Sequence, residues 1–143
     1  MGNVHIEDAF VGTTGGNVDL FTNATTASAA QKDYGHVVVG VEHPRCVRLD
    51  DYFVSATRLD FVKTDTDGFD ADVLLGAREL LERLTPPIYF ELAPSLLADA
   101  SRRPVELLEY LAQLGYRHHL LYTQAGDHPL KLSDDPGEVC SSG

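Results

Sequence analysis

The fold is decided by residues 59–70, whose sequence is LDFVKTDTDGFD. The first apolar positions predict a strand over residues 59–65, and a glycine separates this strand from an amphipathic helix. Because side chains alternate along a strand, Lys63, Asp65 and Asp67 share one face as far as the extended geometry continues. Ligands of parallel α/β sheets bind at the carboxyl ends of the strands. The stretch therefore predicts a lysine and two acids at a ligand-binding strand end.

The same residues also have a purely structural interpretation. The Asp-Gly pair at residues 67–68 is typical of a turn, and an acid at the start of the next helix is stabilised by the helix dipole. Lys63 is then a salt-bridge partner of Asp65. A calcium-binding loop is excluded: with Gly68 at loop position 6, Lys63 and Leu74 fall at positions 1 and 12, where oxygen ligands are required. The functional and the structural interpretation both stay open at this point.

Strand and helix patterns alternate through the second half of the chain. Apolar residues at helical spacing predict helices over residues 69–84 and 104–114, and Gly115 is well placed to end the second. Strands are predicted over residues 88–92 and 116–123. Strands and helices joined by short loops predict a parallel α/β sheet with right-handed crossovers.

A few further side chains are candidates for chemistry. Glu91 ends a predicted strand between two apolar residues, where an acid is costly unless it is paired or functional. His118 and His119 are neighbours on a predicted strand and point to opposite faces, so they do not share a metal ion. Cys46 and Cys140 lie far apart in the sequence and are interpreted as two free thiols. No metal site is predicted.

The N-terminal half is less regular. Strands over residues 4–11 and 18–21, joined by a glycine-rich turn, predict a hairpin, and residues 37–41 form a further strand. The turn is not a phosphate-binding loop, because no Lys-Ser/Thr pair follows it. We expect one domain over residues 1–132 and a polar, disordered tail over residues 133–143.

Composition excludes several classes of partner. The 143 residues carry 22 acidic and 11 basic side chains, which gives a net charge of -11. Nucleic acids and anionic membranes attract basic surfaces, so neither is an expected partner. The N-terminus does not have the pattern of a signal peptide, and no apolar run is long enough to span a membrane. We expect a cytoplasmic protein.

One stretch resembles a known family. Residues 62–70 (VKTDTDGFD) and 73–77 (VLLGA) resemble the FkbM-type family of S-adenosylmethionine-dependent methyltransferases. That family carries a Lys-Ile-Asp-Val-Glu-Gly motif, then an aromatic residue, an acid and a Val-Leu-x-Gly-Ala helix. In this chain Thr64 replaces an apolar residue and Asp67 replaces the glutamate. Five further segments agree with the family in order and spacing: residues 3–12, 18–21, 47–52, 88–92 and 106–116. The resemblance therefore covers most of residues 3–123.

The resemblance implies a partial Rossmann-like class I methyltransferase fold, with a mostly parallel sheet, flanking helices and the N-terminal hairpin. It implies S-adenosylmethionine as cofactor, with an incomplete binding site, because the family's glycine-rich loop and its ribose-binding acid have no counterpart here. Asp8 alone matches a cofactor position, the one near the adenine. The strand over residues 59–65 is expected to have one unpaired edge. Repacked N-terminal strands or a second copy of the chain cover this edge, or the chain is the C-terminal part of a longer protein, which is the interpretation we favour.

Two hypotheses of function follow. In the first, the chain is the C-terminal part of an O-methyltransferase that acts on a hydroxyl of a sugar or another small metabolite. Asp65 is the base or the acceptor contact, Lys63 orients it, and Asp67 and Glu91 are supporting pocket groups. In the second, the chain is a non-catalytic α/β module that has lost cofactor binding and is stabilised by oligomerisation.

Overall fold

The computed structural model describes residues 3–17, 20–22, 27–28, 40–42, 44–66, 69–92, 104–122 and 129–140. These residues form a small α/β structure of short elements, β1 (Phe10–Val11), β2 (Gly16–Asn17), β3 (Leu20–Thr22), β4 (Ala27–Ser28), β5 (Gly40–Glu42), β6 (Arg45–Val47), α1 (Leu49–Tyr52), β7 (Val62–Lys63), α2 (Asp70–Leu75), α3 (Arg78–Leu84), β8 (Ile88–Tyr89), α5 (Pro104–Gln113), β9 (His119–Tyr122), β10 (Pro129–Ser133) and α6 (Pro136–Cys140). None of the helices in the described part is long and apolar enough to cross a membrane.

Strands β7 and β8 form the parallel pair that the sequence predicts. Val62 lies opposite Ile88 in register, and Lys63 lies opposite Tyr89. The pairing extends one residue further, because the Thr64 amide donates to the Tyr89 carbonyl at 3.0 Å. The strands themselves are shorter than the expected ranges of 59–65 and 88–92.

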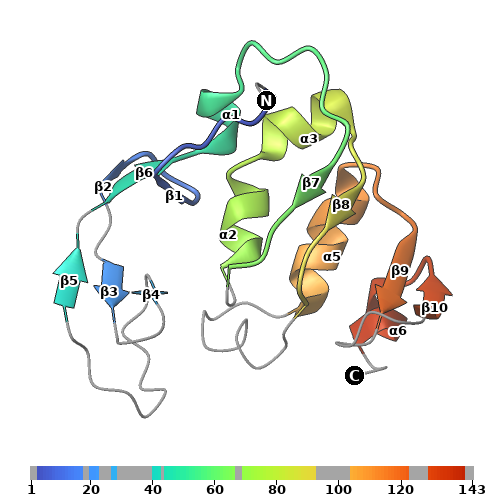
Figure 1. The fold of residues 1–143 in the computed structure, drawn as a ribbon. Coiled ribbons are helices and arrows are strands. Elements are labelled where there is room, and N and C mark those ends of the chain that lie inside the picture. Colours follow the sequence, from blue (N-terminus) through green and yellow to red (C-terminus); the bar gives the residue numbers. More distant parts are fainter. Residues whose placement is uncertain are drawn as a thin grey trace.

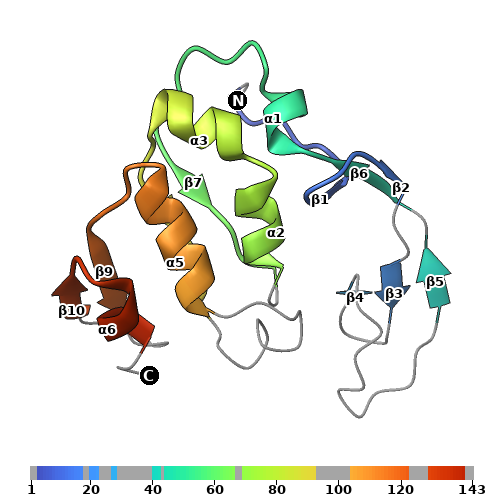
Figure 2. The same ribbon diagram turned by 180° about the vertical axis from the view of Figure 1, so that it is seen from behind.

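Helices α2, α3 and α5 cover one face of this pair. Figure 1 shows β7 and β8 in front of these helices, and Figure 2 shows the helices in front when the molecule is seen from behind. The core is built from buried apolar residues of the helices and of the turns after them: Ala71, Leu74, Ala77, Leu81, Leu107, Leu111 and Leu114. Val62, Ile88, Phe90 and Leu92 of the strand segments pack against this core. Removal of this apolar surface from water is the main force that holds the layers together.

Helix α5 confirms the helix predicted over residues 104–114, and Gly115 follows it with a positive φ of 101°. The single helix predicted over residues 69–84 was wrong, since the structure divides it into α2 and α3 at Gly76 and Ala77. A Cβ atom on Gly76 would lie 2.1 Å from the Gly12 carbonyl oxygen, so only glycine fits at this break.

Asp50 closes the start of α3. Its buried carboxylate accepts a hydrogen bond from the Leu80 amide at 2.9 Å, and Arg48 donates to its second oxygen at 3.1 Å. The Asp50 amide donates to the Gly76 carbonyl at 3.1 Å. Amides in the first turn of a helix have no acceptor within that helix, and the residue at the N-cap, Ala77, supplies no side-chain bond. The Asp50 carboxylate therefore caps the N-terminus of α3, although Asp50 lies in α1 and not next to α3 in the sequence.

The N-terminal hairpin does not form among the described residues. Strands β1 and β2 lie on either side of β6, parallel and antiparallel to it respectively, instead of pairing with each other. Strand β3 pairs with β4 and β5, and residues 3–9 form no strand. The hairpin prediction was wrong because a turn signal reflects only neighbouring residues. Strand β6, at residues 45–47, lies between β1 and β2 and pairs with both. Within the described part β7 pairs with β8 alone, and what covers its other edge stays a prediction.

A mostly parallel sheet was also expected, and the described residues do not show one. Parallel pairing is found between β1 and β6 and between β7 and β8. The pairs β9–β10, β2–β6, β3–β4 and β3–β5 are antiparallel. Short links between neighbouring segments permit antiparallel pairing, and this is the geometry that β9 and β10 adopt. Helix α6 and its buried Val139 lie in the stretch for which a disordered tail was expected, while the domain boundary itself stays a prediction.

We expect Asp50→Ala to lower the free energy of unfolding by about 1–3 kcal/mol, because the Leu80 amide is left buried without an acceptor. Urea unfolding measures the difference. Asp51→Ala is the matched control: its side chain is 66% exposed, and we expect a change within about 0.5 kcal/mol. Equal effects of the two substitutions would contradict the capping role of Asp50.

Candidate functional site

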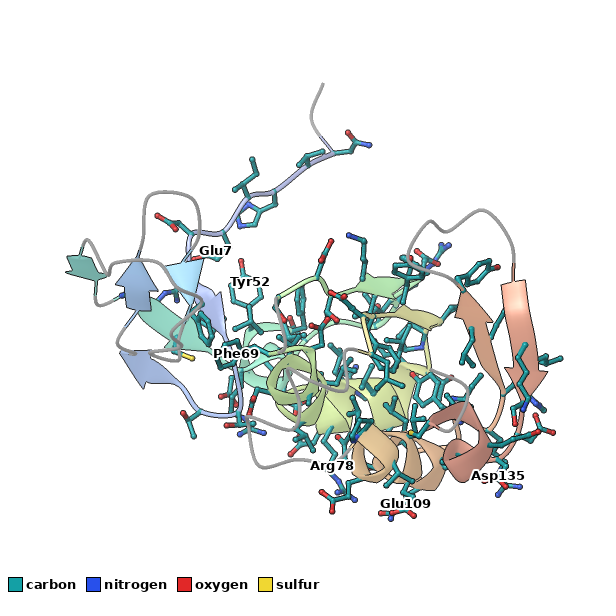
Figure 3. The ribbon with its side chains drawn as sticks, turned by 90° about the horizontal axis from the view of Figure 1, so that it is seen from below. Glu7, Tyr52, Phe69, Arg78, Glu109 and Asp135 are labelled. Atoms are coloured by element: carbon teal, nitrogen blue, oxygen red, sulfur yellow. The ribbon has the colours of Figure 1, made fainter. Side chains whose placement is uncertain are left out.

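The side chains of β7, β8 and the residues that follow alternate between a covered and an open face. Thr64 is buried on the side of the helices, and Phe90 of the β8 segment is partly buried there. Lys63, Asp65 and Glu91 are exposed on the opposite face. Figure 3 views these layers edge-on, with β7 and β8 on one side of the helices. The structure therefore brings these three predicted site residues to one solvent-facing surface.

Lys63 and Asp65 form an ion pair at the end of β7. The Lys63 Nζ donates to Asp65 Oδ2 at 2.8 Å, and the two side chains are 53% and 66% exposed. This hydrogen bond, followed by the attraction between the opposite charges, raises the pKa of Lys63. The two residues form a surface salt bridge. This bond also holds the Asp65 carboxylate at the carboxyl end of a parallel strand, where ligands of such sheets bind.

The other predicted acids of this strand end are less constrained. Glu91 comes two residues after Tyr89, the last paired residue of β8, and its side chain is exposed. Asp67 lies outside the described residues. The roles assigned to Asp65, Lys63, Asp67 and Glu91 therefore stay predictions.

A buried acid directly behind this strand end escaped the sequence reasoning. Asp70, in the first turn of α2, is fully buried, and the Thr64 hydroxyl donates a hydrogen bond to its carboxylate. Thr66 donates to the other carboxylate oxygen from its hydroxyl at 3.0 Å and from its amide at 3.4 Å. The signal in the sequence was Thr64 itself, a polar residue at a position where the family motif is apolar.

Asp8, the predicted cofactor contact, lies in the exposed segment over residues 3–9. Its neighbour Glu7 anchors this segment: Tyr52 of α1 donates to Glu7 at 2.9 Å, and Arg45 of β6 forms an ion pair with it. Figure 3 shows Glu7 and Tyr52 close together. The hydrogen bond lowers the pKa of Glu7 and raises that of Tyr52. His5 also bonds Tyr52, at 3.1 Å, so that the segment carrying Asp8 is tied to α1 and β6.

The remaining polar groups are placed apart from this strand end. Among the described residues, no group of three or more His, Cys, Asp or Glu side chains is arranged to hold a metal ion. His118 bonds Asp134 at 2.6 Å, and burial lowers the pKa of His119. Burial also raises the pKa of each of the two free thiols. An open hollow of about 450 Å³ is lined by residues of β10, α6 and their connection and contains none of the predicted site residues: Leu132, Ser133, Asp134, Asp135 and Glu138.

We expect Asp65→Asn to lower the pKa of Lys63 toward its ordinary value of 10.5, because the charged acceptor is lost. The raised pKa means that the pair stabilises the folded chain below pH 10.5, and that this contribution disappears as the pH rises through the folded-state value. NMR titration of the Lys63 side chain measures the change. Asp60→Asn, at an exposed acid that pairs with Arg58, is the control. An unchanged Lys63 pKa in Asp65→Asn would contradict the pairing.

Comparison with known proteins identifies the family. Neither a curated protein nor a solved structure matches the chain. A family model, that of the methyltransferase FkbM domain, matches residues 3–118 and so covers β1 to α5 together with Asp8, Lys63, Asp65 and Glu91. The matched region makes up most of the 143 residues. This chain belongs to the FkbM methyltransferase domain family.

Proposed function

We propose that the chain is the C-terminal part of an S-adenosylmethionine-dependent O-methyltransferase that acts on a hydroxyl of a sugar or another small metabolite. Membership of the FkbM family supports methyl transfer in general and favours it over a non-catalytic module. The observation that carries the finer proposal is the exposed Lys63–Asp65 pair, which presents a carboxylate to solvent at the end of a parallel strand. A cytoplasmic location and an oligomer that covers the β7 edge stay predictions.

In this proposal Asp65 acts as the general base. Its bond to Lys63 uses Oδ2, which leaves Oδ1 to accept a hydrogen bond from the acceptor hydroxyl. Asp65 would take the hydroxyl proton as the acceptor oxygen bonds to the methyl carbon and the bond from that carbon to the sulfonium sulfur breaks. Lys63 holds the carboxylate in one orientation, and Glu91 and Asp67 bind neighbouring hydroxyl groups of the acceptor. Positioning of the acceptor oxygen by these groups accounts for a large part of the expected rate enhancement.

Asp8 supports the proposed binding of the adenine end of the cofactor. Asp8 is exposed, and within the described part of the chain no hydrogen bond or ion pair occupies its carboxylate. A carboxylate is a suitable acceptor for the amino group of adenine. Glu7, held by Tyr52 and Arg45, fixes the segment that presents Asp8. When bound, S-adenosylmethionine supplies the methyl group from its sulfonium centre.

Titration with S-adenosylhomocysteine by calorimetry tests cofactor binding. Because the family's glycine-rich loop and ribose-binding acid have no counterpart in this chain, we expect binding by the full chain to be weak but saturable. We expect a further loss of roughly tenfold in affinity for Asp8→Asn and an unchanged affinity for Asp65→Asn. The Asp65 variant is the matched control, because it makes the same chemical change at an acid assigned to the acceptor. No binding by a folded chain would contradict the proposal, and equal affinities of the wild type and Asp8→Asn would remove Asp8 from the site.

Transfer of labelled methyl groups to a panel of hydroxylated small molecules tests the role of Asp65. On any acceptor that the wild type methylates, we expect Asp65→Asn to lower kcat by about 10²–10⁴-fold, because general-base assistance is lost. Asp60→Asn, at an exposed acid outside the proposed site, should retain the wild-type kcat. Unaltered turnover in Asp65→Asn would show that Asp65 is not the base.

A further inference from the structure

We propose that Asp70 is a positioning residue for Asp65: its buried carboxylate binds the residues on both sides of Asp65 and so fixes the direction in which the Asp65 side chain points. The catalytic meaning of this role rests on the proposed function. The geometry is independent of it, because Thr64 donates to Asp70 Oδ1 and Thr66 donates to Asp70 Oδ2.

Backbone pairing holds the chain only up to Thr64. Strand β7 ends at Lys63, and the amide of Thr64 makes the last bond to the neighbouring strand, at the Tyr89 carbonyl. Asp65 lies beyond this point. Its position is therefore set by side-chain bonds from α2 rather than by the sheet.

The two threonines act on Asp65 through the alternation of the chain. In an extended segment, residues 64 and 66 point to one face and residue 65 to the other. Thr64 is buried and bound to Asp70, and Thr66 is partly buried and bound to the same carboxylate. With both neighbours held inward, Asp65 is directed outward, where it meets Lys63 at 2.8 Å.

Asp70 itself is held in place from the helical side. It is fully buried in the first turn of α2, and a buried carboxylate is stable only when its oxygens are hydrogen-bonded. The Phe69 amide donates to the Thr66 carbonyl at 3.2 Å, and the Phe69 ring packs edge-on against Phe10 of β1 with ring centres 5.8 Å apart. The strand end is thus fastened to the start of α2, and Phe69, at the N-cap of that helix, contacts β1. Thr64 and Thr66 both occupy positions where the family motif has apolar residues. The hydrogen bonds that their hydroxyls donate to Asp70 therefore depend on the residues that this chain has at those positions.

The test measures the pKa of Lys63 by NMR in the full-length chain, at conditions where each variant is folded. Thr66→Val removes one hydroxyl bond and keeps every charge, so we expect the Lys63 pKa to fall toward 10.5 as Asp65 loses its fixed orientation. Thr66→Ser keeps the hydroxyl and should restore the wild-type value. Asp70→Asn should also lower the Lys63 pKa, but part of that fall comes from loss of the Asp70 charge, which raises the Lys63 pKa directly, so Thr66→Val is the deciding variant. Glu79→Gln, which removes a charge from the first turn of α3, should leave the Lys63 pKa unchanged.

A Lys63 pKa that stays at the wild-type value in folded Thr66→Val would overturn the positioning role, because a residue with only a structural role changes stability and leaves this pKa alone. If Asp70→Asn does not fold, the comparison of Thr66→Val with Thr66→Ser decides the question by itself. None of these measurements requires cofactor or methyl transfer. A chain that fails to bind S-adenosylhomocysteine but shows the expected Lys63 shifts would contradict the proposed function and leave the positioning role intact.

Discussion

A buried carboxylate needs hydrogen-bond donors, and this need governs the start of α2 and the start of α3. At the start of α2, Asp70 collects the donors of Thr64 and Thr66 and fastens the helix to the end of β7. At the start of α3, the Asp50 carboxylate accepts a hydrogen bond from the Leu80 amide and so links α3 to α1. Asp70 thus joins the helical layer to the end of β7, and Asp50 joins it to α1. Apolar contacts are non-directional and do not fix these orientations by themselves.

The exposed strand end follows from this arrangement. The helices cover one face of β7 and β8, so every second residue is directed toward solvent, and Lys63 and Asp65 meet there. Apolar residues and the buried Asp70 pack behind them, while the outward side chains of Lys63 and Asp65 are exposed. Membership of the FkbM family gives this polar surface a chemical context, that of methyl transfer.

The sequence predicted those features that depend on local patterns. The parallel pairing of β7 with β8 and the helix α5 follow from apolar periodicity and from glycine and proline punctuation. The break at Gly76 could not be predicted in this way, because the apolar spacing continues through it and the close approach of the Gly12 carbonyl is a tertiary contact. The N-terminal hairpin failed for the same reason, since β6 separates β1 from β2. Outward placement of Lys63 and Asp65 followed from strand alternation, whereas the burial of Asp70 depends on tertiary contacts that no spacing encodes.

The most direct test of the account is amide chemical-shift mapping of the full chain during addition of S-adenosylhomocysteine. In the proposed function the adenine would bind at Asp8 and methyl transfer would take place at Asp65, with the cofactor between them. We therefore expect amides around both residues to shift along one common saturation curve. Shifts confined to the hollow of β10 and α6, or no shift near either acid in a folded chain, would contradict it.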